Sequence, residues 1–176
     1  MIDRFVPDQY EPSVFDISIE GLKNENIEAI IVDLDNTLIA WDMDEATEEL
    51  KTWFHELHDA GFQITIVSNN SRKRVGTFSE PLGIPFIFRA KKPLSGAFES
   101  ALKRMNSTKE TTVVIGDQLM TDILGGNRRG FRTILVAPVK QNDGFATKFN
   151  RYIERKVFRA MKRKGLIEWN EIEKTK

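Results

Sequence analysis

The sequence of 176 residues predicts an α/β fold in which helices cover both faces of a mainly parallel sheet. Strand-like and helix-like segments alternate along the chain, which is the order typical of such sheets. The strand-like segments are apolar throughout, as strands that are buried on both faces usually are. An apolar fraction of 40% and a charged fraction of 30% are ordinary for a globular protein, so we expect one domain core.

Five strands are predicted from short apolar segments. They span residues 27–34, 62–67, 84–88, 112–115 and 132–136. The first of them is rich in β-branched residues and too short for a helix. In a parallel sheet these strands all end at one edge, and the chemistry of such folds gathers beyond that edge.

Four helices are predicted between the strands. They span residues 44–60, 72–82, 94–105 and 121–129. The first places Leu50, Trp53 and Leu57 on one face and ends at Gly61. The third follows a proline, and Gly130 closes the fourth. The helices therefore carry apolar faces suited to cover the sheet.

The composition excludes several classes of protein. There is no cysteine, so a disulfide scaffold, a thiolate metal site and a cysteine nucleophile are excluded. No apolar segment approaches the ~20 residues that a membrane-spanning helix needs. The first residues lack the pattern of a secretory signal. We therefore expect a cytoplasmic protein, with peripheral contact to the inner face of the membrane as an option that the tail suggests.

Charge is distributed unevenly along the chain, although the formal net charge is zero. Residues 1–60 carry three basic and 16 acidic side chains, residues 61–138 carry twelve and five, and residues 139–176 carry eleven and five. Two interpretations stay open. The basic end binds an anionic partner, or the acidic and basic parts pair with each other.

Polar side chains follow four of the predicted strands, and they are the candidate site residues. They are Asp33, Asp35 and Thr37 after the first strand, Ser68, Asn69 and Asn70 after the second, Lys91 and Lys92 after the third, and Asp117 and Asp122 after the fourth. Because these positions share one edge of the sheet, we expect them to form one site.

This set of residue types suits phosphoryl transfer through an aspartyl-phosphate. Asp33 and Asp35 face the same side because they are two residues apart in extended chain. One can attack the phosphorus while the other moves the proton. Their repulsion calls for a cation, and Mg²⁺ held by Asp33 and Asp117 supplies one. Lys92 neutralises the nucleophile and the phosphoryl group, and Ser68 hydrogen-bonds the phosphoryl oxygens.

The four clusters also resemble the motifs of the haloacid dehalogenase (HAD) superfamily. The matching pattern is Asp-x-Asp-x-Thr, Ser, Lys-Pro and Gly-Asp-x-x-x-x-Asp, between residues 27 and 136. The form Asp33-Leu34-Asp35-Asn36-Thr37-Leu38 is similar to subclass IIIA. The resemblance implies a HAD-like Rossmannoid three-layer sandwich and an Mg²⁺-dependent phosphatase. It also implies a backbone ligand from Asp35, a place for Asp122 in the metal site, and Thr37, Asn69 and Asn70 as substrate-binding residues.

Each assignment has a structural alternative. Asp33 and Asp35 can form a turn with a helix cap, and Ser68 can cap the following helix. Asp122 can be a carboxylate favoured by the N-terminus of its helix. Lys91 could be the working lysine in place of Lys92, although Lys92 directly precedes the proline as in the family pattern.

The chain has no room for a cap domain over the site. About 30 residues separate Asp35 from Ser68, and three residues, 89–91, separate the third strand from Lys92. An uncapped site is open, so its substrate should be large, embedded in a membrane or held by neighbouring surfaces. We therefore expect three segments, namely an extended N-terminal segment (1–26), the catalytic core (27–138) and a basic amphipathic helical tail (139–176).

The tail has an apolar stripe beside a basic ridge at helical spacing. The stripe contains Phe145, Phe149, Ile153, Val157 and Met161, and the ridge contains Lys148, Arg151, Arg155, Arg159 and Lys162. Such a helix can lie on an anionic bilayer. Alternatively, its stripe packs against the domain and its basic face is solvated.

A closer resemblance concerns a bacterial HAD-IIIA group that is similar to the phosphatidylglycerophosphate phosphatases of mitochondria and plastids. It rests on Phe5-Val6-Pro7-Asp8, on the first motif and on residues 116–123. It implies hydrolysis of phosphatidylglycerophosphate to phosphatidylglycerol, with a phosphorylated lipid as the partner of the site. Two alternatives stay open, an uncapped phosphatase for a phosphoprotein or a nucleic-acid end, and a non-catalytic partner-binding protein. Nucleic acid is the less expected partner, and the sequence does not indicate the oligomeric state.

Overall fold

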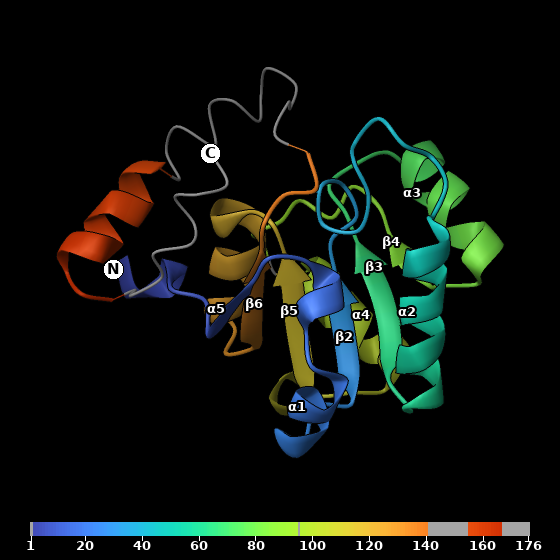
Figure 1. Ribbon diagram of the computed structural model, residues 1–176, viewed down its shortest axis with the longest axis horizontal. Helices are drawn as coiled ribbons and strands as arrows, with labels where there is room; N and C mark the ends of the chain where they lie inside the picture. Colours follow the sequence, from blue (N-terminus) through green and yellow to red (C-terminus); the bar gives the residue numbers. More distant parts are fainter. Residues whose placement is uncertain (1, 95, 141–154, 167–176) are drawn as a thin grey trace.

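A six-stranded parallel sheet forms the middle layer of the computed structural model, which describes residues 2–94, 96–140 and 155–166 (Figure 1). The strand order is β1-β6-β5-β2-β3-β4. The strands are β1 (Gln9–Glu11), β2 (Ala29–Val32), β3 (Gln63–Val67), β4 (Phe86–Ile87), β5 (Thr112–Gly116) and β6 (Arg132–Val136). The predicted α/β class is confirmed, and all five predicted strands are present as β2 to β6. The sheet has one strand more than predicted, β1.

Helices cover both faces of the sheet. They are α1 (Ile19–Asn24), α2 (Glu48–Asp59), α3 (Arg72–Ser79), α4 (Gly96–Met105) and α5 (Leu124–Asn127). The apolar sides of α1, α2 and α3 pack on one face and that of α4 packs on the other (Figure 1). The predicted helix at 121–129 instead starts with a π-helical turn, Leu119–Ile123, before α5.

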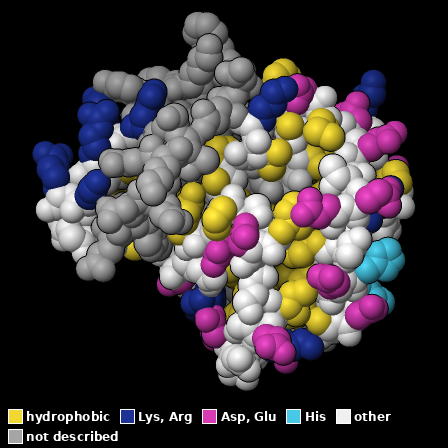
Figure 2. All heavy atoms as spheres, in the orientation of Figure 1, with side chains coloured by type: hydrophobic (Ala, Val, Ile, Leu, Met, Phe, Trp, Pro, Cys, Tyr) yellow, Lys and Arg dark blue, Asp and Glu magenta, His cyan; other side chains and the backbone are white. Residues whose placement is uncertain are grey.

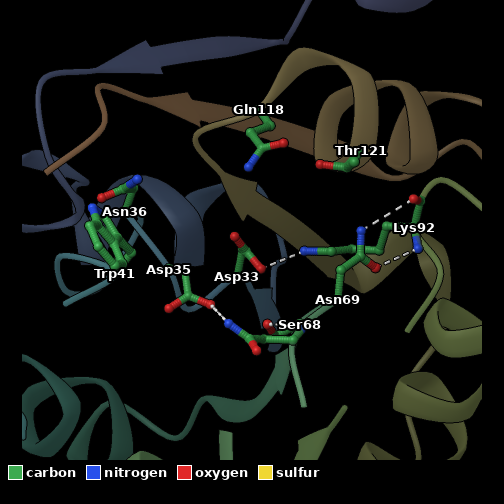
Figure 3. Close-up of a pocket in the computed structure, with 10 residues that line it drawn as sticks. Asp33, Asp35, Asn36, Trp41, Ser68, Asn69, Lys92, Gln118 and Thr121 are labelled. Carbon is green, nitrogen blue, oxygen red and sulfur yellow. Dashed lines mark hydrogen bonds and ion pairs between the residues drawn. The ribbon is translucent and has the colours of Figure 1, made fainter. Parts of the chain in front are cut away.

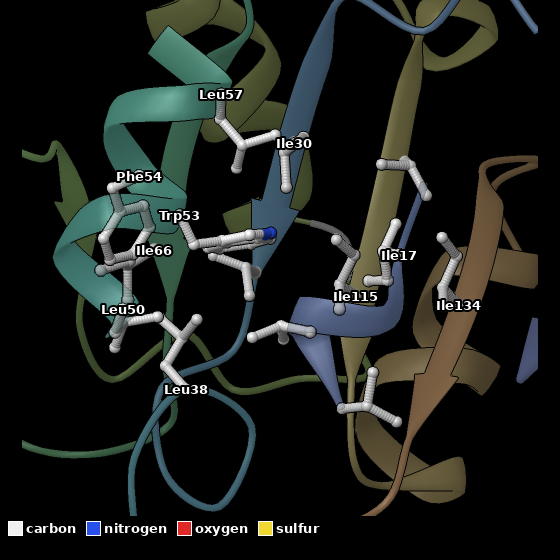
Figure 4. Packing of buried hydrophobic residues seen from close by; sticks show 14 of the residues in the cluster. Ile17, Ile30, Leu38, Leu50, Trp53, Phe54, Leu57, Ile66, Ile115 and Ile134 are labelled. Carbon is white, nitrogen blue, oxygen red and sulfur yellow. The ribbon is translucent and has the colours of Figure 1, made fainter. Parts of the chain in front are cut away.

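The central strand β2 shows why the sheet is buried on both sides. All four of its residues are fully buried. Ile30 and Val32 point into the core under α2, whereas Ala29 and Ile31 point into the core under α4, because successive side chains of a strand alternate. Figure 4 shows Trp53 of α2 lying against the apolar residues of β2 and its neighbours.

The N-terminal segment is only partly extended, which differs from the prediction for residues 1–26. It contains short helices, the helix α1 and the edge strand β1, which pairs with β6. Asn127 holds the start of this segment because its side-chain amide donates hydrogen bonds to the carbonyls of Arg4 (3.0 Å) and Val6 (2.8 Å). The sequence Gln9–Glu11 carries no apolar run, so its strand is not visible to a search for buried strands.

The described part of the tail, residues 155–166, contains a helix at 155–163 that packs on the domain. Met161 is fully buried, and Val157 packs in the same cluster, which includes Leu119 and Ile123 of the π-helical turn. This supports the alternative in which the stripe packs on the domain. Lys and Arg side chains gather on the outer side of this helix (Figure 2).

The rest of the predicted stripe and ridge lies outside the described residues. These positions are Phe145, Lys148, Phe149, Arg151 and Ile153. Among the residues that the structure describes, no helix is both long enough and apolar enough to cross a bilayer.

The absence of a cap domain is confirmed by the two stretches where a cap would be inserted. Between Asp35 and Ser68 the chain forms a loop, α2 and β3. We call the loop, residues 36–47, the flap. Between β4 and Lys92 it forms a short connection.

The order of the strands reverses between the neighbouring strands β2 and β5. From β2 the chain adds β3 and β4 toward one edge of the sheet, and from β5 it adds β6 toward the other edge. In α/β sheets this reversal is where ligands usually bind.

Candidate active site

Three buried carboxylates meet at the point where the strand order reverses. Asp33 directly follows β2, and its backbone N–H donates to the carbonyl of Ile115 in β5 (3.0 Å). Asp117 directly follows β5, and Asp122 lies in the π-helical turn after it. Oxygen atoms of Asp33, Asp117 and Asp122 lie within 4.8 Å of one another. The prediction that these loops converge therefore holds for all three aspartates.

Lys92 is the cation of this cluster. Its Nζ donates to Asp33 Oδ1 and to Asp122 Oδ1, both at 2.6 Å. The lysine is buried (Figure 3), whereas the neighbouring Lys91 is exposed. Asn69 holds the backbone at Lys92 in place, because its Oδ1 accepts a hydrogen bond from the backbone N–H of Lys92 at 2.8 Å. The structure therefore places Lys92, and not Lys91, at the predicted position.

The cluster carries an excess of negative charge. Burial, which disfavours the charged form, raises the pKa of Asp33 from 3.8 to about 7, and the Asp122 carboxylate adds to this rise while Lys92 opposes it. Burial alone would lower the pKa of Lys92, but the carboxylates of Asp122 and Asp33 outweigh it, so that the pKa is raised. Lys92 is thus a permanent cation shared between two carboxylates, and it cannot neutralise all three.

The residues present fit a divalent cation. Three buried carboxylates with one lysine leave two negative charges uncompensated when all four groups are ionised, and hard cations such as Mg²⁺ prefer carboxylate oxygens. Asp117 is held in place by Thr37, whose Oγ1 donates to Asp117 Oδ1 at 3.3 Å. Thr37 is buried beside this carboxylate and is not among the residues that line the pocket. Thr37 therefore contacts a carboxylate of the candidate metal site, and its contact with substrate stays a prediction.

Asp122 reaches the cluster because of a glycine and a π-helical turn. A Cβ atom on Gly116 would lie 2.3 Å from Asp122 Cγ, so only glycine leaves room for this carboxylate. Asp122 Oδ2 accepts from the backbone N–H of Gln118 (3.2 Å) while Oδ1 binds Lys92. Asp122 therefore lies at the start of its helix and also belongs to the carboxylate cluster, and its role as a metal ligand stays a prediction. Single π-helical turns are frequent at functional sites.

Asp35 lies beside the cluster and not in it. Its Oδ1 accepts from Arg74 Nε at 2.9 Å, and its Oδ2 accepts from Asn70 Nδ2 at 3.0 Å. Figure 3 shows its carboxylate directed away from Lys92, toward which Asp33 points. The predicted backbone ligand to a metal from Asp35 stays a prediction.

Ser68 is buried at the floor of the pocket and does not cap a helix. Its Oγ accepts from the backbone N–H of Asn70 at 3.1 Å. The cap of α3 is Ser71, whose Oγ accepts from the backbone N–H of Arg74 at 3.3 Å. The alternative that Ser68 caps the next helix is therefore wrong, and its role toward a phosphoryl group stays a prediction.

The pocket above the cluster has a volume of about 380 Å³ and a polar lining (Figure 3). The lining comprises Asp33, Asp35, Asn36, Trp41, Ser68, Asn69, Asn70, Lys92, Gln118 and Thr121. The predicted Asn69 and Asn70 are among these residues. Trp41, which is 49% exposed, brings an apolar ring to the pocket from the flap.

Besides Asn36, which lies inside the first motif, four residues of the site were not predicted, namely Trp41, Arg74, Gln118 and Thr121. Arg74 had a signal in the sequence. It lies in the first turn of α3, where no acidic residue is present and a positive charge opposes the helix dipole. A local rule that is broken in this way often marks a functional position. The other three gave no signal, since single polar or aromatic residues in loops are common.

The fold and the site together define an α/β phosphohydrolase without a cap domain. The sequence profile of a family described as HAD-hydrolase-like matches residues 89–146. The chain is 54% identical over 167 residues to the protein named Probable phosphatase YqeG of Bacillus subtilis (strain 168), covering 95% of this chain and 97% of the relative. The protein belongs to the HAD superfamily and is a phosphatase of that superfamily, as the sequence predicts.

Two further similarities are more distant. The chain is 29% identical over 167 residues to Phosphatidylglycerophosphate phosphatase 1, chloroplastic/mitochondrial, of Arabidopsis thaliana, covering 85% of this chain but only 46% of the plant protein. The fold of the present chain is similar to that of the cobalt-bound deoxy-D-mannose-octulosonate 8-phosphate phosphatase (YrbI) of Haemophilus influenzae. That similarity has a TM-score of 0.54 at 22% identity and covers 65% of this chain and 70% of the other. It concerns the fold alone.

Proposed function

We propose that the protein is an Mg²⁺-dependent phosphomonoesterase that acts through an aspartyl-phosphate on Asp33, with phosphatidylglycerophosphate as its substrate. The observation that carries the reaction type is the buried cluster of Asp33, Asp117 and Asp122 around Lys92. A nucleophilic carboxylate needs its own charge offset before it can approach an anionic phosphate. The Nζ atom of Lys92 lies 2.6 Å from Asp33 Oδ1, so the lysine offsets part of the charge of this carboxylate.

The residues can perform hydrolysis in two displacements. An oxygen of Asp33 attacks the phosphorus, the bond from phosphorus to the substrate oxygen breaks, and Asp35 gives its proton to that leaving oxygen. Asp35 then takes a proton from water, whose oxygen attacks the phosphorus, and the bond to Asp33 breaks. Bound Mg²⁺ would supply electrostatic compensation between carboxylate and phosphate oxygens. Lys92 and Ser68 hold the transferring group, as hydrogen-bond donors to its oxygens.

A lipid substrate is supported by three observations. The site lacks a cap, so a phosphate on a membrane surface has access to it. Trp41 lies exposed at the pocket and suits the boundary between headgroups and acyl chains. The plant relative named a phosphatidylglycerophosphate phosphatase shares 29% of its residues with this chain over the aligned region.

The test is a substrate panel with purified protein. Phosphatidylglycerophosphate in mixed micelles, soluble phosphomonoesters, a phosphopeptide and 5′-phosphorylated DNA are assayed with Mg²⁺ and with EDTA. We expect release of phosphate from the lipid with Mg²⁺ only, and a kcat/KM at least ~100-fold lower for the other substrates. Brisk turnover of a soluble phosphomonoester without turnover of the lipid would remove the lipid part. The Asp33→Asn variant should lose at least ~10³-fold in kcat while keeping its fold, and full activity would falsify the nucleophile assignment.

We also propose that the basic side of the C-terminal helix brings the protein to the anionic inner face of the membrane from the cytoplasm. Arg155, Arg159 and Arg163 are exposed on that helix, while Met161 is buried. Each cation near an anionic bilayer contributes ~1 kcal/mol. Flotation with phosphatidylglycerol vesicles should therefore fall when the three arginines are changed to Gln. Equal flotation of that variant, or tighter binding to single-stranded DNA at matched salt, would refute the proposal.

A further inference from the structure

Arg74 makes four contacts that join two parts of the active site. Its Nε donates to Asp35 Oδ1 at 2.9 Å. Its terminal nitrogens donate to three groups of the flap, the carbonyl of Met43, Asp44 Oδ1 (3.0 Å) and the carbonyl of Ala40 (3.4 Å). The arginine side chain is only 11% exposed, and its bonds to Asp35 and to the carbonyl of Ala40 are partly buried, whereas its partner Asp44 is 75% exposed.

The contacts are those of a planar guanidinium and not of a point charge. Arginine offers five N–H donors in a rigid fork, so it can bind a carboxylate on one edge and carbonyl oxygens on the other. Lysine has three donors on one atom and cannot span both. The position in the first turn of α3 is electrostatically unfavourable for a cation. Its contacts with Asp35 and with the flap compensate for this position.

Both oxygens of Asp35 are held by this arrangement. Oδ1 is bound by Arg74, and Oδ2 is bound by Asn70 at 3.0 Å. The flap that Arg74 also binds carries Trp41, which lines the pocket. A displacement of the flap therefore moves the guanidinium, and the guanidinium moves the carboxylate of Asp35.

We propose that Arg74 is a positioning residue that couples the flap to Asp35, so that contact of a substrate with the flap sets the position of the carboxylate that moves the proton. This inference rests on the proposed function, because it takes Asp35 as the group that protonates the leaving oxygen. It assigns no contact between Arg74 and the phosphate.

The test is the dependence of kcat/KM on the leaving group. For a poor leaving group the rate depends on a well-placed proton donor, whereas p-nitrophenolate leaves without one. The measured quantity is the ratio of kcat/KM for p-nitrophenyl phosphate to kcat/KM for phenyl phosphate. We expect this ratio to rise at least ~10-fold in Arg74→Met, as it should in Asp35→Asn. A merely structural role would lower both rates equally and leave the ratio unchanged, which would overturn the proposal.

Three further variants test the parts of the coupling. Arg74→Lys keeps the charge but not the fork, so the raised ratio should persist; a wild-type ratio would overturn the bridging role. Asp44→Ala removes the acceptor of one flap contact and should raise the ratio about threefold. An unchanged ratio in this variant would contradict the part of the proposal that involves the flap. Arg72→Met is the matched control. Arg72 lies on the same turn, with its guanidinium 6.0 Å from the ring of Phe88, and its loss should leave the ratio unchanged.

The wild-type protein separates failure of the inference from failure of the proposed function. Absence of turnover of phosphatidylglycerophosphate and of both aryl phosphates by the wild type, with Mg²⁺ present, contradicts the proposed phosphomonoesterase and with it the coupling. Turnover of both by the wild type, with equal losses in Arg74→Met, contradicts the coupling alone. Thermal melting of each variant identifies a loss that is due to unfolding.

Discussion

Replacement of Asp33 by Asn should stabilise the metal-free protein at the same time as it abolishes activity. The pKa of Asp33 is about 7 in the fold and 3.8 ordinarily, because burial and a second carboxylate disfavour its charge. A raised carboxyl pKa favours the fold below pH ~4, and this contribution is lost as the pH rises through 7. One pKa unit corresponds to ~1.4 kcal/mol, so the ionised carboxylate costs about 4 kcal/mol at pH 8. Asparagine has nearly the same shape and carries no charge.

The measurement is thermal melting in EDTA at pH 4, 6 and 8. For a protein of this size 1 kcal/mol shifts the midpoint by ~2–4 °C, so Asp33→Asn should melt roughly 10 °C above the wild type at pH 8 and close to it at pH 4. Mg²⁺ should raise the midpoint of the wild type more than that of the variant, because it binds the carboxylates of the folded state. The control is Asp59→Asn, whose carboxylate is 81% exposed and should show no trend. An equal midpoint at pH 8 would refute the electrostatic strain inferred for the cluster.

The remaining predictions concern packing around the buried carboxylates and the π-helical turn. Gly116→Ala places a Cβ atom 2.3 Å from Asp122 Cγ, so it should displace that carboxylate, lower kcat at least ~10-fold and destabilise the fold by about 2 kcal/mol in urea unfolding. Gly96→Ala has open space and is its control; a full-activity Gly116→Ala would contradict the crowding. Met161→Ala should lower the free energy of unfolding by about 3 kcal/mol, because Met161 is fully buried against residues of the π-helical turn. The control is Leu94→Ala, because the side chain of Leu94 is 61% exposed and its loss should lower the free energy of unfolding by less than ~0.5 kcal/mol. Equal losses in the two variants would contradict the packing of the helix at 155–163 on the domain.

The sequence predicts those parts of the molecule where local pattern and tertiary structure agree. Strand β2 is apolar throughout, and it is buried on both faces. Asp33, Lys92 and Asp117 follow their strands, and a parallel sheet brings the ends of its strands together whatever the details of packing. The convergence of Asp33, Lys92 and Asp117 therefore follows from topology.

The parts that were missed depend on contacts between segments far apart in the chain. Strand β1 is half-buried at the edge of the sheet, so it needs no apolar pattern. Thr37 matches a family motif, but the motif does not indicate that the hydroxyl donates to Asp117 (3.3 Å). Arg74 is 39 positions from Asp35, and only the fold of the flap brings its partners together. The π-helical turn, which holds Asp122 beside Gly116, is not revealed by any helical periodicity.

The uneven charge of the chain is explained in part by pairs within the domain. Among the described residues, five ion pairs join carboxylates of the first 60 residues to later cations, namely Asp33–Lys92, Asp35–Arg74, Asp44–Arg74, Glu25–Arg132 and Asp42–Lys140. Two of these bonds hold the active site, so the acidic start of the chain belongs to the chemistry. No such pair is made in the described part by Arg155, Arg159 and Arg163, whose helix presents its cations outward (Figure 2). The pairing interpretation thus applies to these residues, and an anionic partner is proposed only for the helix. Because exposed charges are screened by salt, binding there should weaken with ionic strength while the buried pairs keep the site intact.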